Sequence, residues 1–247
     1  YILRLPQARA WGIFSRPPRD RLAEREQRRV GYGAGASYFI EVGAFAAMTF
    51  IAGQLGAAET SAWTIVLNVT AIIFMIPLGL SAATGVVVGK AYGARDAAAL
   101  MRAGLIGIVI VTVLSLVVAL VVWPGAPWIA RAYNRDPVLL AMVVPALVLT
   151  TLFFVADAIQ AVAAQANRAA GDVLWPTLMH FVAYGGIMIP LGWVLAHRMG
   201  VNGLVWSIIV ASLVSATLLT GRFIRIARRR KREMAGSAQV LQQQGIL

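Results

Sequence analysis

The sequence contains no cysteine and has few charged residues for its length. Without cysteine, a disulfide framework and a cysteine-based metal site are both excluded. Charged residues make up only 13% of the chain, whereas a soluble domain averages about 25%. In their place, 60% of the residues are hydrophobic and the mean hydropathy is +0.76. The chain is therefore expected to be an integral membrane protein.

Catalytic signatures are also missing. The two histidines, His180 and His197, lie on different segments, and no GxSxG, HExxH or Walker motif occurs. The net charge of +12 would suggest a nucleic-acid partner if it formed one face of a domain, but the basic residues cluster at both ends of the chain. We therefore expect neither an enzyme nor a nucleic-acid-binding protein.

Six long apolar segments account for most of the chain. A membrane-spanning helix needs about 20 mostly apolar residues, and the breaks between the segments carry turn or charge signals such as Pro124-Gly125. The predicted fold is thus an all-α integral membrane protein, a bundle of six transmembrane helices. The predicted spans are residues 31–55, 62–87, 103–123, 138–163, 174–196 and 203–222.

The distribution of basic residues predicts the orientation of the bundle. By the positive-inside rule, loops rich in Lys and Arg stay in the cytoplasm. With six spans, 19 basic residues, Arg168 among them, fall on the side that holds both termini, and three fall on the opposite side. We therefore expect both termini to be cytoplasmic.

Two carboxylates, Glu41 and Asp157, lie inside apolar stretches long enough to cross a bilayer. A carboxylate near the bilayer centre costs roughly 2.5–3.5 kcal/mol on insertion scales, so such residues usually face a protein interior or a water-filled cavity. Glu41 lies roughly 15 Å into its span, and the depth of Asp157 is compatible with one shared cavity. Such a pair would exchange protons or bind a neutralising cation, as in an ion-coupled transporter. The simpler alternative is that each acid only hydrogen-bonds a neighbouring helix.

Other polar residues in the spans are candidates for the same site. Gln160 follows Asp157 by three positions and therefore shares its helix face. His180 lies in the fifth span, where we expect a buried neutral ring bonded to a backbone carbonyl. Further polar candidates on neighbouring spans are Asn68, Thr70 and Tyr184.

The order and spacing of several short motifs are similar to those of a known transporter family. These motifs begin with Glu41-Val42-Gly43-Ala44-Phe45, Gly53-Gln54-Leu55-Gly56-Ala57 and Phe74-Met75-Ile76-Pro77-Leu78-Gly79, and continue with Val88-Gly89-Lys90-Ala91-Tyr92-Gly93, Asp157-Ala158-Ile159-Gln160, Ile189-Pro190-Leu191-Gly192 and Gly203-Leu204-Val205-Trp206. Together they resemble the C-terminal lobe of the multidrug and toxic compound extrusion (MATE) transporters, most of all the bacterial NorM-like branch. The resemblance covers about residues 12–226.

The resemblance implies a multidrug efflux antiporter of the bacterial inner (plasma) membrane, built from two six-helix lobes around a central cavity. The family exports organic, often aromatic cations in exchange for protons or sodium, with no cofactor besides the coupling ion. Glu41 and Asp157 match carboxylate positions that the family uses for the coupling ion and the substrate cation. They would also be the ligands of a sodium ion. The implied partners are organic cations, the lipid bilayer and an N-terminal lobe.

The same resemblance suggests how the chain is divided. Residues 1–30 would be a basic cytoplasmic linker between lobes, residues 31–226 the six-helix C-terminal lobe, and residues 227–247 a basic cytoplasmic tail. The chain begins at Tyr1, not Met, and its first residues resemble the end of an earlier apolar segment. We therefore interpret the chain as the C-terminal part of a longer protein.

Two positions depart from the family pattern. Phe153 stands where some relatives have a tyrosine one turn before the aspartate. The lost hydroxyl removes a possible sodium ligand and favours protons. Gly33 stands where a proline is usual at the start of the lobe's first helix, and it is expected to alter how the chain enters that helix.

Three alternatives stay open at the level of sequence. A lipid-linked oligosaccharide flippase of the same superfamily would line its cavity with basic residues, but no basic residue lies deep within any predicted span. The chain could also be a non-transporting membrane fragment. Finally, it could be a half-size transporter that acts as a homodimer and so reproduces the two-lobe design.

Overall fold

The computed structural model describes residues 20–243 as a bundle of long helices, with no strand in that part of the chain. The helices are α2 (Arg21–Leu55), α3 (Ala57–Gly93), α4 (Ala97–Tyr133), α5 (Pro137–Ala169), α6 (Leu174–His180), the π-helix η2 (Phe181–Met188), α7 (Ile189–Met199) and α8 (Val201–Gln243). Because α6, η2 and α7 follow one another without a break, they form a single span. The described residues thus contain six segments long and apolar enough to cross a membrane, which confirms the predicted all-α class.

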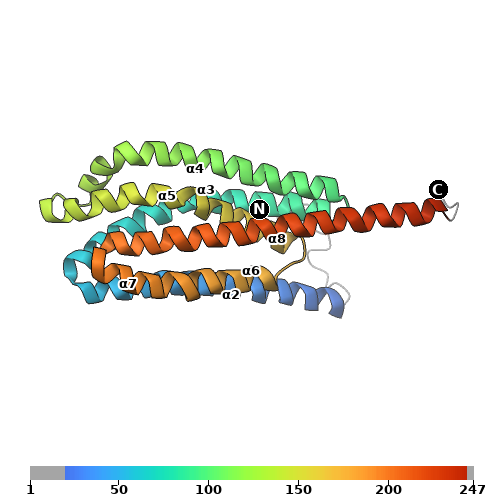
Figure 1. The fold of residues 1–247 in the computed structure, drawn as a ribbon, viewed down its shortest axis with the longest axis horizontal. Coiled ribbons are helices and arrows are strands. Elements are labelled where there is room, and N and C mark those ends of the chain that lie inside the picture. The colour runs from blue at the N-terminus through green and yellow to red at the C-terminus, as the bar shows by residue number, and fades with distance from the viewer. Residues whose placement is uncertain (1–19, 244–247) are drawn as a thin grey trace, which may run out of the picture.

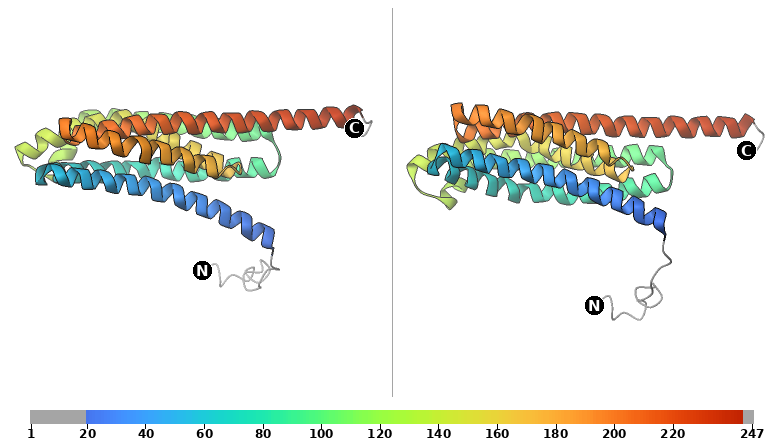
Figure 2. Two further views of the ribbon diagram at one scale, coloured as in Figure 1. Left: turned by 60° about the horizontal axis from the view of Figure 1, so that its bottom comes forward. Right: turned by 90° about the horizontal axis from the view of Figure 1, so that it is seen from below.

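The six spans run alternately up and down, so α2 begins and α8 ends at the same end of the bundle (Figure 1). We call this the basic end, because the arginine-rich starts and ends of these two helices lie there. Helix α5 packs against α3, α4 and α8, and α8 in turn contacts every other span. Helix α2 packs beside α6, η2 and α7, and α8 projects beyond the bundle at the basic end (Figure 2).

Each predicted span falls inside one of these segments, but the helices are longer than the spans. Helix α2 begins at Arg21 because the Asp20 side chain accepts hydrogen bonds from the backbone N–H groups of Leu22 and Ala23 and so caps its start. The predicted break at Pro124-Gly125 is wrong, since α4 continues through it to Tyr133. A proline within a membrane helix is tolerated where its surroundings satisfy the freed carbonyl.

The predicted division into linker, lobe and tail stays a prediction. Residues 1–19, most of the predicted linker, and residues 244–247, the end of the predicted tail, lie outside the described part of the chain.

Gly33 has a different role from the one expected. It lies well inside α2 and not at the helix start, so it does not control the entry of the chain into the helix. A Cβ atom at this position would overlap the Val173 side chain, and the Gly33 carbonyl accepts a hydrogen bond from Thr177 Oγ1 at 2.9 Å. Gly33 therefore allows α2 to approach α6 closely.

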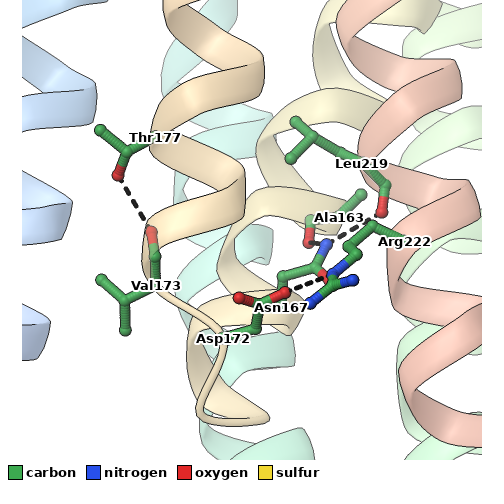
Figure 3. Close-up of polar contacts among 7 residues, drawn as sticks. All are labelled: Ala163, Asn167, Asp172, Val173, Thr177, Leu219 and Arg222. Carbon is green, nitrogen blue, oxygen red and sulfur yellow. Dashed lines mark hydrogen bonds and ion pairs between the residues drawn. The ribbon is translucent and has the colours of Figure 1, made fainter. Parts of the chain in front are cut away.

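At the basic end, a polar network fastens α5 and the α5–α6 turn to α8 (Figure 3). The buried Asn167 side chain donates from Nδ2 to the carbonyls of Ala163, at 2.8 Å, and Leu219, at 2.9 Å. Beside it, Arg222 Nε on α8 lies 2.6 Å from Asp172 Oδ2 in the turn. These contacts hold α5 and α8 together at the basic end of the bundle.

Replacing Asn167 by Ala is expected to lower the free energy of unfolding by about 1–3 kcal/mol, because two buried hydrogen bonds, to the Ala163 and Leu219 carbonyls, are lost and each contributes about 0.5–1.5 kcal/mol. Thermal unfolding of the purified protein in detergent measures the change. Thr217→Ala is the matched control, since within residues 20–243 the exposed Thr217 hydroxyl bonds only to its own helix, at Leu213. Equal melting temperatures for the two variants would contradict this role of Asn167.

Candidate cation site

Asp157 lies in the middle of the bundle and accepts hydrogen bonds from three different side chains. Its Oδ1 atom lies 3.4 Å from Gln160 Nε2, 3.4 Å from the Tyr184 hydroxyl and 3.5 Å from Ser212 Oγ. The donors come from α5 itself, from η2 and from α8, and Asp157 is only 8% exposed. A carboxylate surrounded by donors in this way is held in a fixed position.

Glu41, on α2, is joined to Asp157 by the same glutamine. Gln160 Nε2 lies 3.5 Å from Glu41 Oε1, so the two hydrogens of one amide are directed at two carboxylates. The two acidic oxygens are therefore no farther apart than these two hydrogen-bond lengths together. The structure thus brings together three residues that the sequence singles out on two different helices.

The π-helix η2 brings Tyr184 to this pair. Pro190 follows η2 by two residues and has no N–H, so the Gly186 carbonyl lacks the donor that an α-helix would supply. A π-helix within a membrane span is unusual and often occurs at functional sites. The Tyr184 ring is fully buried and lies 5.7 Å, centroid to centroid, from the His180 ring and 6.5 Å from Phe45.

A cleft of about 260 Å³ opens beside the two acids. Its walls come from α2, α3 and α5 and combine four aromatic rings with two carboxylates, with no basic side chain among the lining residues. Its lining residues are Tyr38, Glu41, Val42, Phe45, Leu67, Thr70, Ala71, Phe74, Phe153 and Asp157.

The other predicted site residues fall into two groups. Phe153 lines the cleft one turn before Asp157, packed edge-to-face against Phe154 at 5.3 Å, and Thr70 lines the cleft from α3. Asn68 is not brought to the acids: its Oδ1 atom accepts a hydrogen bond from the Tyr133 hydroxyl at 2.9 Å. A polar residue in a span can be satisfied by a neighbouring helix without joining the site.

Behind Glu41, a second and much smaller cavity of about 20 Å³ leads toward the basic end. We call it the inner chamber. Tyr38, Glu41 and Phe74 line both the cleft and this chamber. The remaining lining residues of the chamber are Leu78, Ser81, Gln160, Ala161, Ala164, Arg168 and His180.

Two residues of the inner chamber differ from the sequence-based expectation. His180 is buried, but neither ring nitrogen has a hydrogen-bond partner among the residues that the structure describes, so the expected bond to a backbone carbonyl is absent. Arg168 belongs to the last turn of α5 and not to a loop, and it is only 8% exposed. Arg168 lies beyond the predicted span of residues 138–163, but because α5 continues to Ala169, this arginine lines the inner chamber, though not the cleft.

Sequence reasoning also missed Ser212, because a serine in a helix rich in small residues is typical of helix packing. As for metals, residues 20–243 contain no group of three or more His, Asp or Glu side chains that could hold an ion. A sodium ion at Glu41 and Asp157 would instead draw on the neighbouring hydroxyl and amide oxygens, which are ligands that hard cations accept.

Comparison with known proteins places this chain in a family. The MatE family profile matches residues 34–194. A protein of Caulobacter vibrioides named "Probable multidrug resistance protein NorM" is 52% identical over 225 residues, which make up 90% of this chain and 48% of that protein. A protein of the same name from Aromatoleum aromaticum is 30% identical over 241 residues, or 93% of this chain and 51% of that one. The chain thus spans about half the length of these curated relatives.

Solved structures show the same fold. The structure titled "Crystal structure of MATE in the bent conformation" superposes with a TM-score of 0.82 at 20% identity, over 90% of this chain and 50% of that one. The structure titled "Outward-facing conformation of a multidrug resistance MATE family transporter of the MOP superfamily" superposes with a TM-score of 0.81 at 20% identity, over 87% of this chain and 49% of that one. The match to the family profile and the 52% identical relative show that this chain, a multi-pass membrane protein, belongs to the MatE family of multidrug efflux transporters, which are not enzymes.

Proposed function

We propose that this chain forms one lobe of a multidrug cation antiporter and that Glu41 and Asp157 are its cation site. The observation that carries the proposal is the pairing of the two carboxylates by Gln160 on the wall of an aromatic-lined cleft. Two acids are rarely placed together within the membrane, and those that are usually handle ions or charged substrates.

The lining of the cleft favours an aromatic or otherwise apolar organic cation as the substrate. Aromatic faces attract cations, and Tyr38, Phe45, Phe74 and Phe153 supply four of them around the acids. Drug-sized ligands occupy pockets of roughly 300–1,000 Å³, so the cleft of about 260 Å³ would hold part of such a molecule. The absence of a basic side chain from its lining argues against a pyrophosphate-linked substrate.

The coupling mechanism follows from competition for one pair of acids. A proton or a sodium ion occupies the pair in the absence of substrate, and an organic cation displaces it. Because the site prefers one positive occupant at a time, inward movement of the ion drives outward movement of the substrate. The hydroxyls of Tyr184 and Ser212 keep Asp157 in place during the exchange.

The setting of the lobe is part of the proposal. Both termini would lie in the cytoplasm of a bacterial cell and the bundle in its inner membrane, in line with the positive charge at the basic end. The open side of the cleft would face a second six-helix half, which completes the cavity. That half would be an N-terminal lobe of the same polypeptide or, in a half-size transporter, a second copy of the chain.

Transport by the complete protein in liposomes tests the proposal and identifies the coupling ion. An imposed proton gradient or an imposed sodium gradient should drive accumulation of an aromatic cation such as ethidium, and dissipating that gradient should stop it. Accumulation driven by neither gradient, or loss of transport only in variants outside the cleft, would contradict the assignment of an ion-coupled cation site.

A further inference from the structure

Arg168 lies directly behind the wall that carries Glu41. It lines the inner chamber together with Glu41, and its guanidinium carbon lies 5.7 Å from the centre of the Tyr38 ring. Tyr38 precedes Glu41 by one turn of α2 and lines both cavities. The Tyr38 ring therefore lies close to the guanidinium and also borders the cleft.

The charge of Arg168 is not consumed by a direct ion pair. Within residues 20–243, no salt bridge joins Arg168 to Glu41, to Asp157 or to any other acid. Its side chain donates from Nη1 to Gln165 Oε1 at 3.3 Å, and its buried Nε has no partner in that part of the chain. An arginine that is 8% exposed and lacks an adjacent carboxylate needs compensation from charges farther away.

Glu41 and Asp157 are the acids that can supply this compensation. Of the charged side chains that line the cleft or the inner chamber, these two are acidic and Arg168 is basic. With His180 counted as neutral, the formal charge of the three residues is −1 when both acids are ionised. The interior of a membrane protein screens charges weakly, so the site as a whole is neutralised by a single positive charge.

We propose that Arg168 is a specificity-determining residue that restricts the site to one monovalent cation at a time. This inference rests on the proposed function, since it takes Glu41 and Asp157 as the cation site. The guanidinium offsets one of the two acidic charges from behind. An organic monocation or one coupling ion then balances the remainder, and a dication leaves an uncompensated positive charge. The substrate class is therefore organic cations that carry one charge.

Paired dyes that share one ring system test this inference. Ethidium carries one positive charge and propidium carries two, and fluorescence titration of the complete transporter in detergent gives the affinity for each. Wild-type protein should bind ethidium at least about tenfold more tightly than propidium. In Arg168→Gln this preference should fall on the order of tenfold, because the second charge is no longer repelled.

Two control variants separate the local charge from other effects. Arg168→Lys keeps the positive charge and should keep the preference. Arg102→Gln removes an exposed arginine of α4 that, among the described residues, bonds only to its own helix, at Ala98, and it should leave the preference unchanged. If Arg168→Gln does not fold, the wild-type preference and its retention in Arg168→Lys remain measurable.

The possible outcomes are distinct. A wild-type protein that binds both dyes equally, or a folded Arg168→Gln variant with the wild-type ratio, overturns the inference about Arg168 and leaves the proposed cation site intact. Dye binding that is unaffected by both Glu41→Gln and Asp157→Asn overturns the proposed function itself.

Discussion

Replacing Asp157 by Asn is expected to reduce cation export by the complete transporter to background. The asparagine side chain has the same size and its oxygen still accepts the hydrogen bonds from Tyr184 and Ser212, so the fold should be kept. What is lost is the negative charge that balances the coupling ion and the substrate. Resistance to toxic cations, in cells that lack their own efflux pumps, measures export, and an immunoblot of the membrane fraction measures insertion.

Asp96→Asn is the matched control for this change. Asp96 caps the start of α4 at the exposed basic end, where its side chain accepts from the Ala99 N–H at 2.8 Å. Asparagine caps a helix about as well as aspartate, so this variant should export normally. Normal resistance in cells that carry Asp157→Asn would show that Asp157 is not part of the coupling site.

Gly203→Ala is expected to lower the free energy of unfolding strongly, because Gly203 lies at the start of α8, where that helix passes close to α7. A Cβ atom there would overlap the Leu195 carbonyl and come within 2.7 Å of the Ala196 nitrogen. Because these are backbone atoms, no change of rotamer relieves the overlap, and the two helices must move apart. Overpacking of this kind costs about 1–3 kcal/mol, which thermal unfolding in detergent detects.

Gly221→Ala provides the comparison within the same helix. Nothing lies within 4 Å of a Cβ atom at this position. Alanine in a helix interior is favoured over glycine by roughly 0.5–1 kcal/mol, so Gly221→Ala should unfold at the same or a higher temperature than the wild type. Equal stability of the two variants would mean that α7 and α8 are less closely packed than described.

The fold was largely predictable because a bilayer imposes a simple requirement. Each crossing needs a long apolar helix, and six such segments are plain in the sequence. The helix ends were not predictable in the same way, since a helix continues beyond the membrane wherever capping and packing support it. Asp20 extends α2 backward, and α4 passes through Pro124. The π-helix η2 left no signal in hydropathy, because its residues are as apolar as their neighbours.

The candidate site was predictable in part for a similar reason. Glu41 and Asp157 stand out because an acid in an apolar span is rare, and Gln160 follows from its position one turn after Asp157. Ser212 carries no such signal. Arg168 was assigned to a loop because it lies near a charged break in the sequence, and its burial depends on packing against residues distant in the chain. Asn68 has the right residue type, but Tyr133 takes up its hydrogen bond.

Equilibrium binding of ethidium to the wild type, to Glu41→Gln, to Asp157→Asn and to the double variant tests the central claim, that Glu41 and Asp157 form one site. If they share a cation through Gln160, each single change weakens binding strongly, and the double change weakens it by much less than the product of the two single effects. Losses that multiply, as expected for independent positions, or a single variant with wild-type affinity would contradict a shared site.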